Sequence, residues 1–217
     1  MLVGERMSKP VITIRPDTTM PEALELMHKE HIRRLPVVNQ HGQLIGIVTE
    51  ADLLRASPSE ATSLSIYEVT YLLGKLTIDR LMTKNVITVT EDTPIEEAAR
   101  IMADNNFSGL PVMRGKEMVG IITETSLFRI FLELLGARRP GIRVTARVPD
   151  KPAQLAALTQ AIHAAGGNII ALGTSLGESP AEGTVTIKVD SVEMEPLKKA
   201  IQPLVNKIVD IRTTSIS

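Results

Sequence analysis

An internal duplication is the feature that most restricts how this chain of 217 residues can fold. The segment that begins at Met7, MSKPVITIRPDTTMPEALELMHKEHIRRLPVV, aligns with the segment that begins at Met82, MTKNVITVTEDTPIEEAARIMADNNFSGLPVM. The register shifts by one residue in the next turn, and the match resumes as GIVTEADLL from Gly46 and GIITETSLF from Gly120. Because one such unit is too small to bury the face of its own sheet, we expect the two copies to pack against each other.

Each copy is predicted to contain its elements in the order β-α-β-β-α. The predicted strands cover 11–14, 35–38 and 44–48 in the first copy and 86–89, 110–113 and 118–122 in the second. In the second copy we expect Thr93 to cap the first helix, with Pro94 as its first residue. The second helix of each copy is expected to start at Thr49 or Thr123, directly after a strand.

A linker helix is predicted between the copies, because apolar residues recur there at helical spacing. These residues are Ile66, Val69, Leu72 and Leu73. The predicted limits are 1–56 and 82–137 for the two copies, 57–81 for the linker region and 138–217 for a C-terminal domain.

The C-terminal region has a different pattern, β-α-β-β-α-β, which is the order of a ferredoxin-like split βαβ unit. Its predicted strands begin with IRVTARV and continue over 168–176, 183–189 and 208–214, and its second helix covers about 194–206. We expect Asp150 to cap the first helix of this unit and Gly166-Gly167 to end it.

Composition excludes several classes of partner. The 24 basic and 25 acidic side chains give a formal charge of -1, whereas binding to nucleic acid or to an anionic membrane needs concentrated positive charge. The chain has no cysteine, and therefore no disulfide framework and no thiolate metal site, which fits a reducing compartment. No apolar run reaches membrane-spanning length and the N-terminus is too charged for a signal peptide, so we expect a cytoplasmic protein without nucleic-acid or membrane partners.

Motifs of catalysis and of metal binding are missing from the sequence. There is no Gly-x-x-x-x-Gly-Lys loop, no cysteine nucleophile and no recognisable Ser/His/Asp arrangement. His28 and His31 share a helix face but lack an obvious third ligand, so we predict no metal site. The chain is therefore expected not to be an enzyme and to use no catalytic cofactor.

The residues quoted above carry a resemblance to known families. With its VITI, RRLPVV and GIVTEADL segments, the duplicated unit resembles a tandem pair of CBS domains, called a Bateman module. The segment DKPAQLAALTQAIHAAGGNI resembles an ACT domain. The order of the domains and the linker TSLSIYEVTYLLGKL are similar to those of bacterial acetoin-utilisation CBS-ACT proteins.

This resemblance implies an α+β fold in which two CBS repeats pack as a pair before a ferredoxin-like ACT domain. It also implies a non-catalytic regulatory protein that holds AMP, ATP or S-adenosylmethionine in the cleft between the repeats. A homodimer is expected, which signals to a metabolic partner of unknown identity. The alternative is a dimeric scaffold protein with no nucleotide ligand.

The phrase GIVTEADLL supplies groups that suit a nucleotide. The Thr49 hydroxyl lies where a strand turns into a helix and can contact a phosphate, and Asp52 can accept hydrogen bonds from both ribose hydroxyls. Thr-x-x-Asp at a helix start can equally act as a capping box that needs no ligand. The residues expected at this first site are Ile12, Thr13, Arg33, Arg34, Leu35, Pro36, Thr49 and Asp52.

A second, weaker site is expected in the other copy. Thr123 is retained there, whereas Ser126 replaces the aspartate, and a neutral hydroxyl holds a ribose less strongly than a carboxylate does. The residues expected at the second site are Ile87, Thr88, Leu110, Pro111, Thr123 and Ser126.

Arg33 and Arg34 stand where the second copy carries Ser108 and Gly109. Two guanidinium groups at the cleft could hold phosphates, and they could equally belong to a solvated turn.

An ACT effector site is implied at Asp150, Pro152, Asn168 and Ile169. The family commonly has glycine after the proline, where this chain has Ala153. Amino-acid binding and a purely dimerising ACT domain therefore both stay open.

Overall fold

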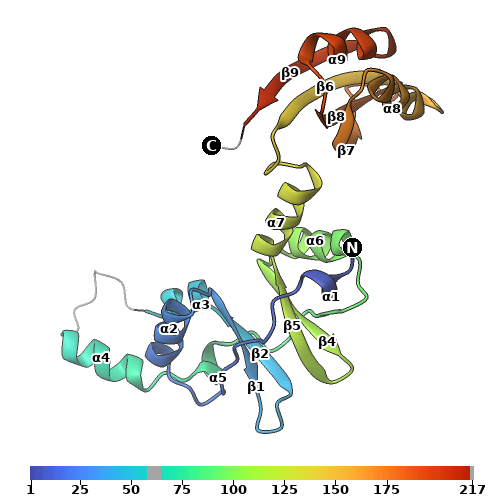
Figure 1. Ribbon diagram of the computed structural model, residues 1–217. Helices are drawn as coiled ribbons and strands as arrows, with labels where there is room; N and C mark the ends of the chain where they lie inside the picture. The colour runs from blue at the N-terminus through green and yellow to red at the C-terminus, as the bar shows by residue number, and fades with distance from the viewer. Residues whose placement is uncertain (58–64, 216–217) are drawn as a thin grey trace. The chain divides into compact units, whose positions relative to one another are not determined.

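The computed structural model describes residues 1–57 and 65–215 of the chain (Figure 1). The chain divides into two compact units, Met1–Leu127 and Phe128–Ser217. Within the described ranges, no helix has both the length and the apolar character that crossing a membrane requires. The limits of the individual domains stay predictions.

The first repeat is a two-stranded antiparallel sheet with helices packed on it. Its elements are α2 (Met20–Lys29), β1 (Arg34–Val38), β2 (Leu44–Thr49) and α3 (Glu50–Ala56). Helix α2 begins at a capping box between Thr19 and Glu22. Its buried face, which includes Met20, Ala23 and Met27, packs into the core that the two strands supply. The predicted hairpin and the predicted helix start at Thr49 are confirmed.

The second repeat adds a short third strand to the same plan. Its elements are β3 (Val89–Thr90), α6 (Ile95–Asn105), β4 (Gly109–Arg114), β5 (Glu117–Thr123) and α7 (Glu124–Leu134). The prediction that Thr93 caps α6 is wrong, because its hydroxyl oxygen accepts a hydrogen bond from the Thr90 N–H (3.0 Å) and closes the preceding turn. Pro94 lies at the N-cap position instead, without a side-chain cap.

The first predicted strand of each copy forms only in small part, although the structure describes all of its residues. Of 11–14, Ile14 alone pairs, through a single parallel bridge to Val37, and of 86–89 only Val89 lies in a strand. The reason is that both segments run between the two repeats and leave one sheet before they join the next.

These crossing segments tie the repeats together by main-chain pairing in both directions. After α1 (Val3–Arg6), the Ser8 N–H donates to the Ile121 carbonyl in β5 (2.9 Å), and the Ile121 N–H donates back (3.1 Å). After α5 (Ile78–Leu81), Thr83 and Ile47 in β2 exchange the same two bonds at 2.9 and 3.0 Å. The first residues of each copy therefore pair with the sheet of the other copy.

The linker contains helix α4 (Ile66–Gly74). The Ser65 hydroxyl oxygen accepts from the Glu68 N–H (3.3 Å), and the Glu68 carboxylate accepts from the Ser65 N–H (2.9 Å), which completes a capping box. Leu73 packs against the core of the first repeat. Residues 58–64 lie outside the described residues, as do the side chains of Ile66 and Val69.

The second unit has the predicted order β-α-β-β-α-β. After the end of α7 it contains β6 (Gly141–Pro149), α8 (Gln154–Ala164), β7 (Asn168–Leu176), β8 (Glu182–Asp190), α9 (Met194–Ile201), a 3-10 turn η1 (Gln202–Leu204) and β9 (Lys207–Thr214). The antiparallel sheet has the strand order β7-β8-β6-β9. Both helices cover one face, where Leu158 and Leu197 pack with the inward side chains of β6 (Figure 1).

Two local predictions for this unit are wrong. Asp150 does not cap α8, because the chain turns through residues 150–153 first and Ala153 occupies the N-cap position in the left-handed conformation (φ 66°). Helix α9 ends at Ile201 rather than at 206, because the ring of Pro203 cannot continue an α-helix.

Candidate functional site

Thr49 and Asp52 form a complete capping box at the start of α3. The Asp52 N–H donates to the Thr49 hydroxyl oxygen (3.3 Å), and Asp52 Oδ2 accepts from the N–H (3.0 Å) and the hydroxyl (2.6 Å) of Thr49. The other carboxylate oxygen, Oδ1, lies outside this box and 3.7 Å from Nη1 of Arg55. Capping therefore occupies one oxygen of Asp52 and leaves the other facing a cation.

A cavity of about 550 Å³ adjoins this box, a size typical of small-molecule sites. Both repeats contribute to its wall. The first repeat supplies Arg33, Arg34, Ile47, Thr49, Glu50, Ala51, Asp52 and Arg55. The second supplies Thr83, Asn85, Val86, Ile87, Asn106, Phe107, Ser108, Gly109 and Pro111.

The structure regroups the residues predicted for the two sites. Four residues of the first predicted set line this cavity, namely Arg33, Arg34, Thr49 and Asp52. Ile87 and Pro111, which were assigned to the second site, line the same cavity. Ile87 reaches it because segment 83–89 crosses to β2 of the first repeat, whereas Pro111 lies in β4 of the second repeat.

The other four residues of the first predicted set lie elsewhere. Leu35 is fully buried in the core of the first repeat, Pro36 is buried beside it, and Ile12 packs against the same core. Thr13 lines a different cavity. The N-terminal run that carries Ile12 and Thr13 therefore does not join Thr49 and Asp52.

The second predicted set is dispersed in the same way. Ser126 donates its N–H to the Thr123 hydroxyl oxygen (3.3 Å), and the two hydroxyl oxygens lie 3.3 Å apart at the start of α7. Leu110 is a core residue and Thr88 is exposed. Where Asp52 offers a carboxylate, this position offers only a hydroxyl.

Arg34 reaches from the first repeat to the second. Its Nη2 donates to the hydroxyl oxygen of Ser108, and its guanidinium lies over Gly109, where an added Cβ would come within 3.0 Å of Cζ. Burial lowers the pKa of Arg34, an effect that Glu124 opposes and Arg33 reinforces. The small residue in the second repeat thus makes room for the large one in the first.

Charged residues of both signs surround the cavity. Three arginines, Arg33, Arg34 and Arg55, line it with the carboxylates of Glu50 and Asp52, and the charge of Glu124 also acts on Arg34. Sequence reasoning missed Arg55, although its position one helical turn after Asp52 could have suggested it. It also missed Phe107 and Asn85, which no local pattern connects with Thr49.

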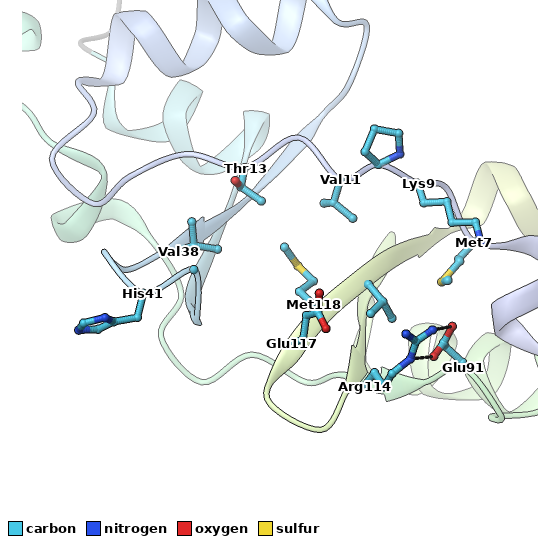
Figure 2. A pocket seen from close by; sticks show the side chains of 13 residues that line it. Met7, Lys9, Val11, Thr13, Val38, His41, Glu91, Arg114, Glu117 and Met118 are labelled. Atoms are coloured by element: carbon cyan, nitrogen blue, oxygen red, sulfur yellow. Dashed lines mark hydrogen bonds and ion pairs between the residues drawn. The ribbon is translucent and has the colours of Figure 1, made fainter.

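A second cavity, of about 750 Å³, lies between segment 7–13 and the two hairpin turns (Figure 2). Arg114 donates to both carboxylate oxygens of Glu91 there (2.6 and 2.8 Å), as the dashed lines in Figure 2 indicate. This contact with Arg114, reinforced by the charge of Lys9, lowers the pKa of Glu91. Because Arg114 and Glu91 neutralise each other, this cavity offers less to an anionic ligand than the first.

The residues proposed for an ACT effector site are not brought together within the chain. Asp150 and Pro152 are exposed beyond the end of β6, which pairs with the start of β8 through Pro149 and Glu182. Asn168 pairs with Asp190 at the end of β8, and its side-chain amide donates to the Asp190 carboxylate (2.9 Å). The two pairs therefore lie at opposite ends of the sheet, with Ile169 packed against the core.

Some of the solved structures that resemble the two repeats contain adenosine ligands. A CBS domain pair solved with 5'-methylthioadenosine and S-adenosyl-L-methionine is 34% identical to this chain. The match covers 64% of this chain and 98% of the other, with a TM-score of 0.52. CBSX2, a CBS-pair protein of Arabidopsis thaliana, was solved with AMP. It is 29% identical to this chain, and the match covers 61% of this chain and 97% of CBSX2 with a TM-score of 0.52.

Among curated proteins, L-aspartate semialdehyde sulfurtransferase of Methanocaldococcus jannaschii is 36% identical over 131 residues, which is 60% of this chain. The match spans 23% of that enzyme's length. The sequence pattern of the CBS domain matches residues 3–59 and 78–133, which is more than half of the chain. The protein therefore belongs to the CBS domain family.

Proposed function

We propose that this protein is a non-catalytic regulatory protein that binds an adenosine-containing ligand in the Thr49–Asp52 cavity. The observation that carries the proposal is the composition of this cavity, in which a Thr-x-x-Asp box and three arginines from the first repeat face apolar residues that the second repeat supplies. The adenosine ligands of the structurally similar CBS pairs support the same assignment.

Three parts of the cavity match three parts of a nucleotide. Oδ1 of Asp52, which capping does not use, would accept hydrogen bonds from the ribose hydroxyls. Val86, Ile87 and Phe107 supply apolar surface for the base. Arg34, whose guanidinium is partly buried, is the group best placed for a phosphate.

The charge of the cavity selects among adenosine ligands. AMP and ATP carry phosphate, 5'-methylthioadenosine is neutral, and S-adenosylmethionine carries a sulfonium cation. Because the guanidinium groups of the cavity can donate hydrogen bonds to phosphate oxygens, the cavity is expected to favour phosphorylated ligands over the sulfonium compound.

Isothermal titration calorimetry with AMP, on the wild type and on Asp52→Asn, tests the proposal. Removing the charge of Asp52 should weaken AMP binding about 10- to 100-fold, because a charge-assisted hydrogen bond contributes about 1.5–3 kcal/mol. Glu22→Gln makes the same kind of change in the capping box of α2 and should leave AMP binding unaltered. Equal loss in both variants would assign the effect to helix capping.

We also propose that the second unit is an ACT domain and that the protein acts as a cytoplasmic homodimer. The strand order β7-β8-β6-β9 under two helices supports the first proposal. Dimerisation, rather than amino-acid binding, is the favoured role, because the four expected effector residues do not converge within one chain. A part in acetoin utilisation is supported by the sequence resemblance and by the solved structure of a putative acetoin utilization protein from Vibrio cholerae, to which this chain is 28% identical with a TM-score of 0.53.

A scaffold protein with an empty cavity is the second candidate. The observation in its favour is that the Thr49–Asp52 box caps α3 and needs no ligand to do so. Absence of any heat or thermal shift with AMP, ATP, 5'-methylthioadenosine and S-adenosylmethionine would support the scaffold and overturn the ligand-binding proposal.

A further inference from the structure

Helix α4 packs on the first repeat with one side and leaves an apolar side uncovered. Leu73 faces the core of the first repeat. Tyr67, Tyr71 and Leu72 are 84%, 61% and 52% exposed. These are both of the tyrosines in the chain, and a large aromatic surface on a capped helix is typical of a contact site.

The exposed side carries opposite charges at its two ends. Glu68, Tyr71, Leu72 and Lys75 follow the spacing i, i+3, i+4 and i+7, which places them on one stripe. The stripe begins with an acidic residue and ends with a basic one. The Lys75 ammonium lies 4.2 Å from the centroid of the Tyr71 ring, which holds the charge beside the apolar centre.

We propose that this stripe is a homodimer contact, in which α4 of a second copy lies antiparallel against it. Glu68 and Lys75 are equally far from the midpoint between Tyr71 and Leu72. A two-fold axis through that midpoint would therefore pair Glu68 of each copy with Lys75 of the other and bring the apolar residues together. The inference rests on the homodimer proposed above and does not depend on the nucleotide ligand.

Charge complementarity also decides the direction of the pair. A parallel arrangement would set Glu68 against the second copy's Glu68 and repeat the clash at Lys75, whereas the antiparallel one forms two ion pairs. These would lie about 10 Å apart, given a rise of about 1.5 Å per residue. Because a nine-residue helix buries little area, we expect a dimer that dissociates on dilution.

Charge reversal tests the pairing directly. Analytical ultracentrifugation of full-length Lys75→Glu and of Glu68→Lys should each show at least a tenfold weaker self-association than the wild type. Mixing the two variants should restore dimers, because a heterodimer then contains two opposite-charge pairs. Lys116→Glu, at a hairpin turn, is the matched control and should behave as wild type, and circular dichroism checks that the helix content is retained.

Cross-linking gives an independent reading, because the chain contains no cysteine. Under mild oxidation, Leu72→Cys should form a disulfide-linked dimer, and Lys116→Cys should not. A wild type that is monomeric at all concentrations would overturn the homodimer itself. A wild-type dimer that tolerates both charge reversals, or in which Leu72→Cys does not cross-link, would overturn only the α4 contact.

Discussion

The thioether of Met82 packs against Gly46, so that a Cβ on residue 46 would fall within 2.9 Å of the methionine Cγ. Met7 lies in the same way against Gly120, the matching position of the other repeat. The first residue of each aligned copy thus covers a glycine in the other copy. This reciprocal contact explains why glycine opens both GIVTEADLL and GIITETSLF.

Replacing either glycine should destabilise the paired repeats. Gly46→Val and Gly120→Val are each expected to lower the free energy of unfolding by about 1–3 kcal/mol, because the added atoms overpack the contact with methionine. Urea denaturation measures the change. Gly74→Ala, where an added Cβ meets nothing within 4 Å, is the control and should not destabilise the protein. Equal stability of all three variants would contradict the close packing.

Arg34 should distinguish phosphorylated ligands from neutral ones. Arg34→Met is expected to weaken AMP binding about 10- to 100-fold through loss of a charge-assisted bond, and to leave 5'-methylthioadenosine binding unchanged. Calorimetry with both ligands measures the difference. Arg33→Met removes an exposed arginine from the same cavity and should have the smaller effect. If Arg34→Met lowered the affinity for both ligands equally, Arg34 would support the shape of the cavity rather than bind the phosphate.

Glu91 should contribute a pH-dependent part of the stability. The hydrogen bonds from Arg114 lower its pKa from the usual 4.5 in the folded protein. A lowered pKa stabilises the fold at pH values above 4.5, and this contribution is lost as the pH falls through the folded-state pKa. In Arg114→Met, NMR titration of labelled glutamate should show the pKa of Glu91 moving back up. An unchanged pKa would remove Arg114 as the cause.

Replacing Ala153 by glycine should stabilise the protein. Its φ of 66° lies in the left-handed region, which costs a residue with a Cβ about 1–2 kcal/mol. Ala153→Gly is therefore expected to raise the free energy of unfolding by up to about 1 kcal/mol, after the greater entropy of glycine in the unfolded chain is subtracted. Ala157→Gly, inside α8, should lower it by about 1 kcal/mol. Chemical denaturation of both variants measures the free energy of unfolding. Opposite signs for the two variants would show that the left-handed conformation of Ala153, and not glycine in general, causes the gain.

Local patterns in the sequence determined much of the secondary structure. The span of β7 agrees with its prediction at both ends, and the hairpins of both repeats lie where alternating apolar runs and a turn indicated them. The Thr49 capping box is equally local, since its two partners are three residues apart. Such features depend on neighbours in the chain, so that periodicity and turn residues suffice to place them.

Only the tertiary structure decided which residues share a site. Ile87 lies with Thr49 because the segment through Thr83 crosses to β2. Asp150 is separated from Asn168 because the end of β6 and the start of β7 pair with opposite ends of β8. No pattern within one copy encodes the crossing. It follows from the burial of two incomplete sheets against each other, a long-range gain in free energy that neighbouring residues in the sequence do not record.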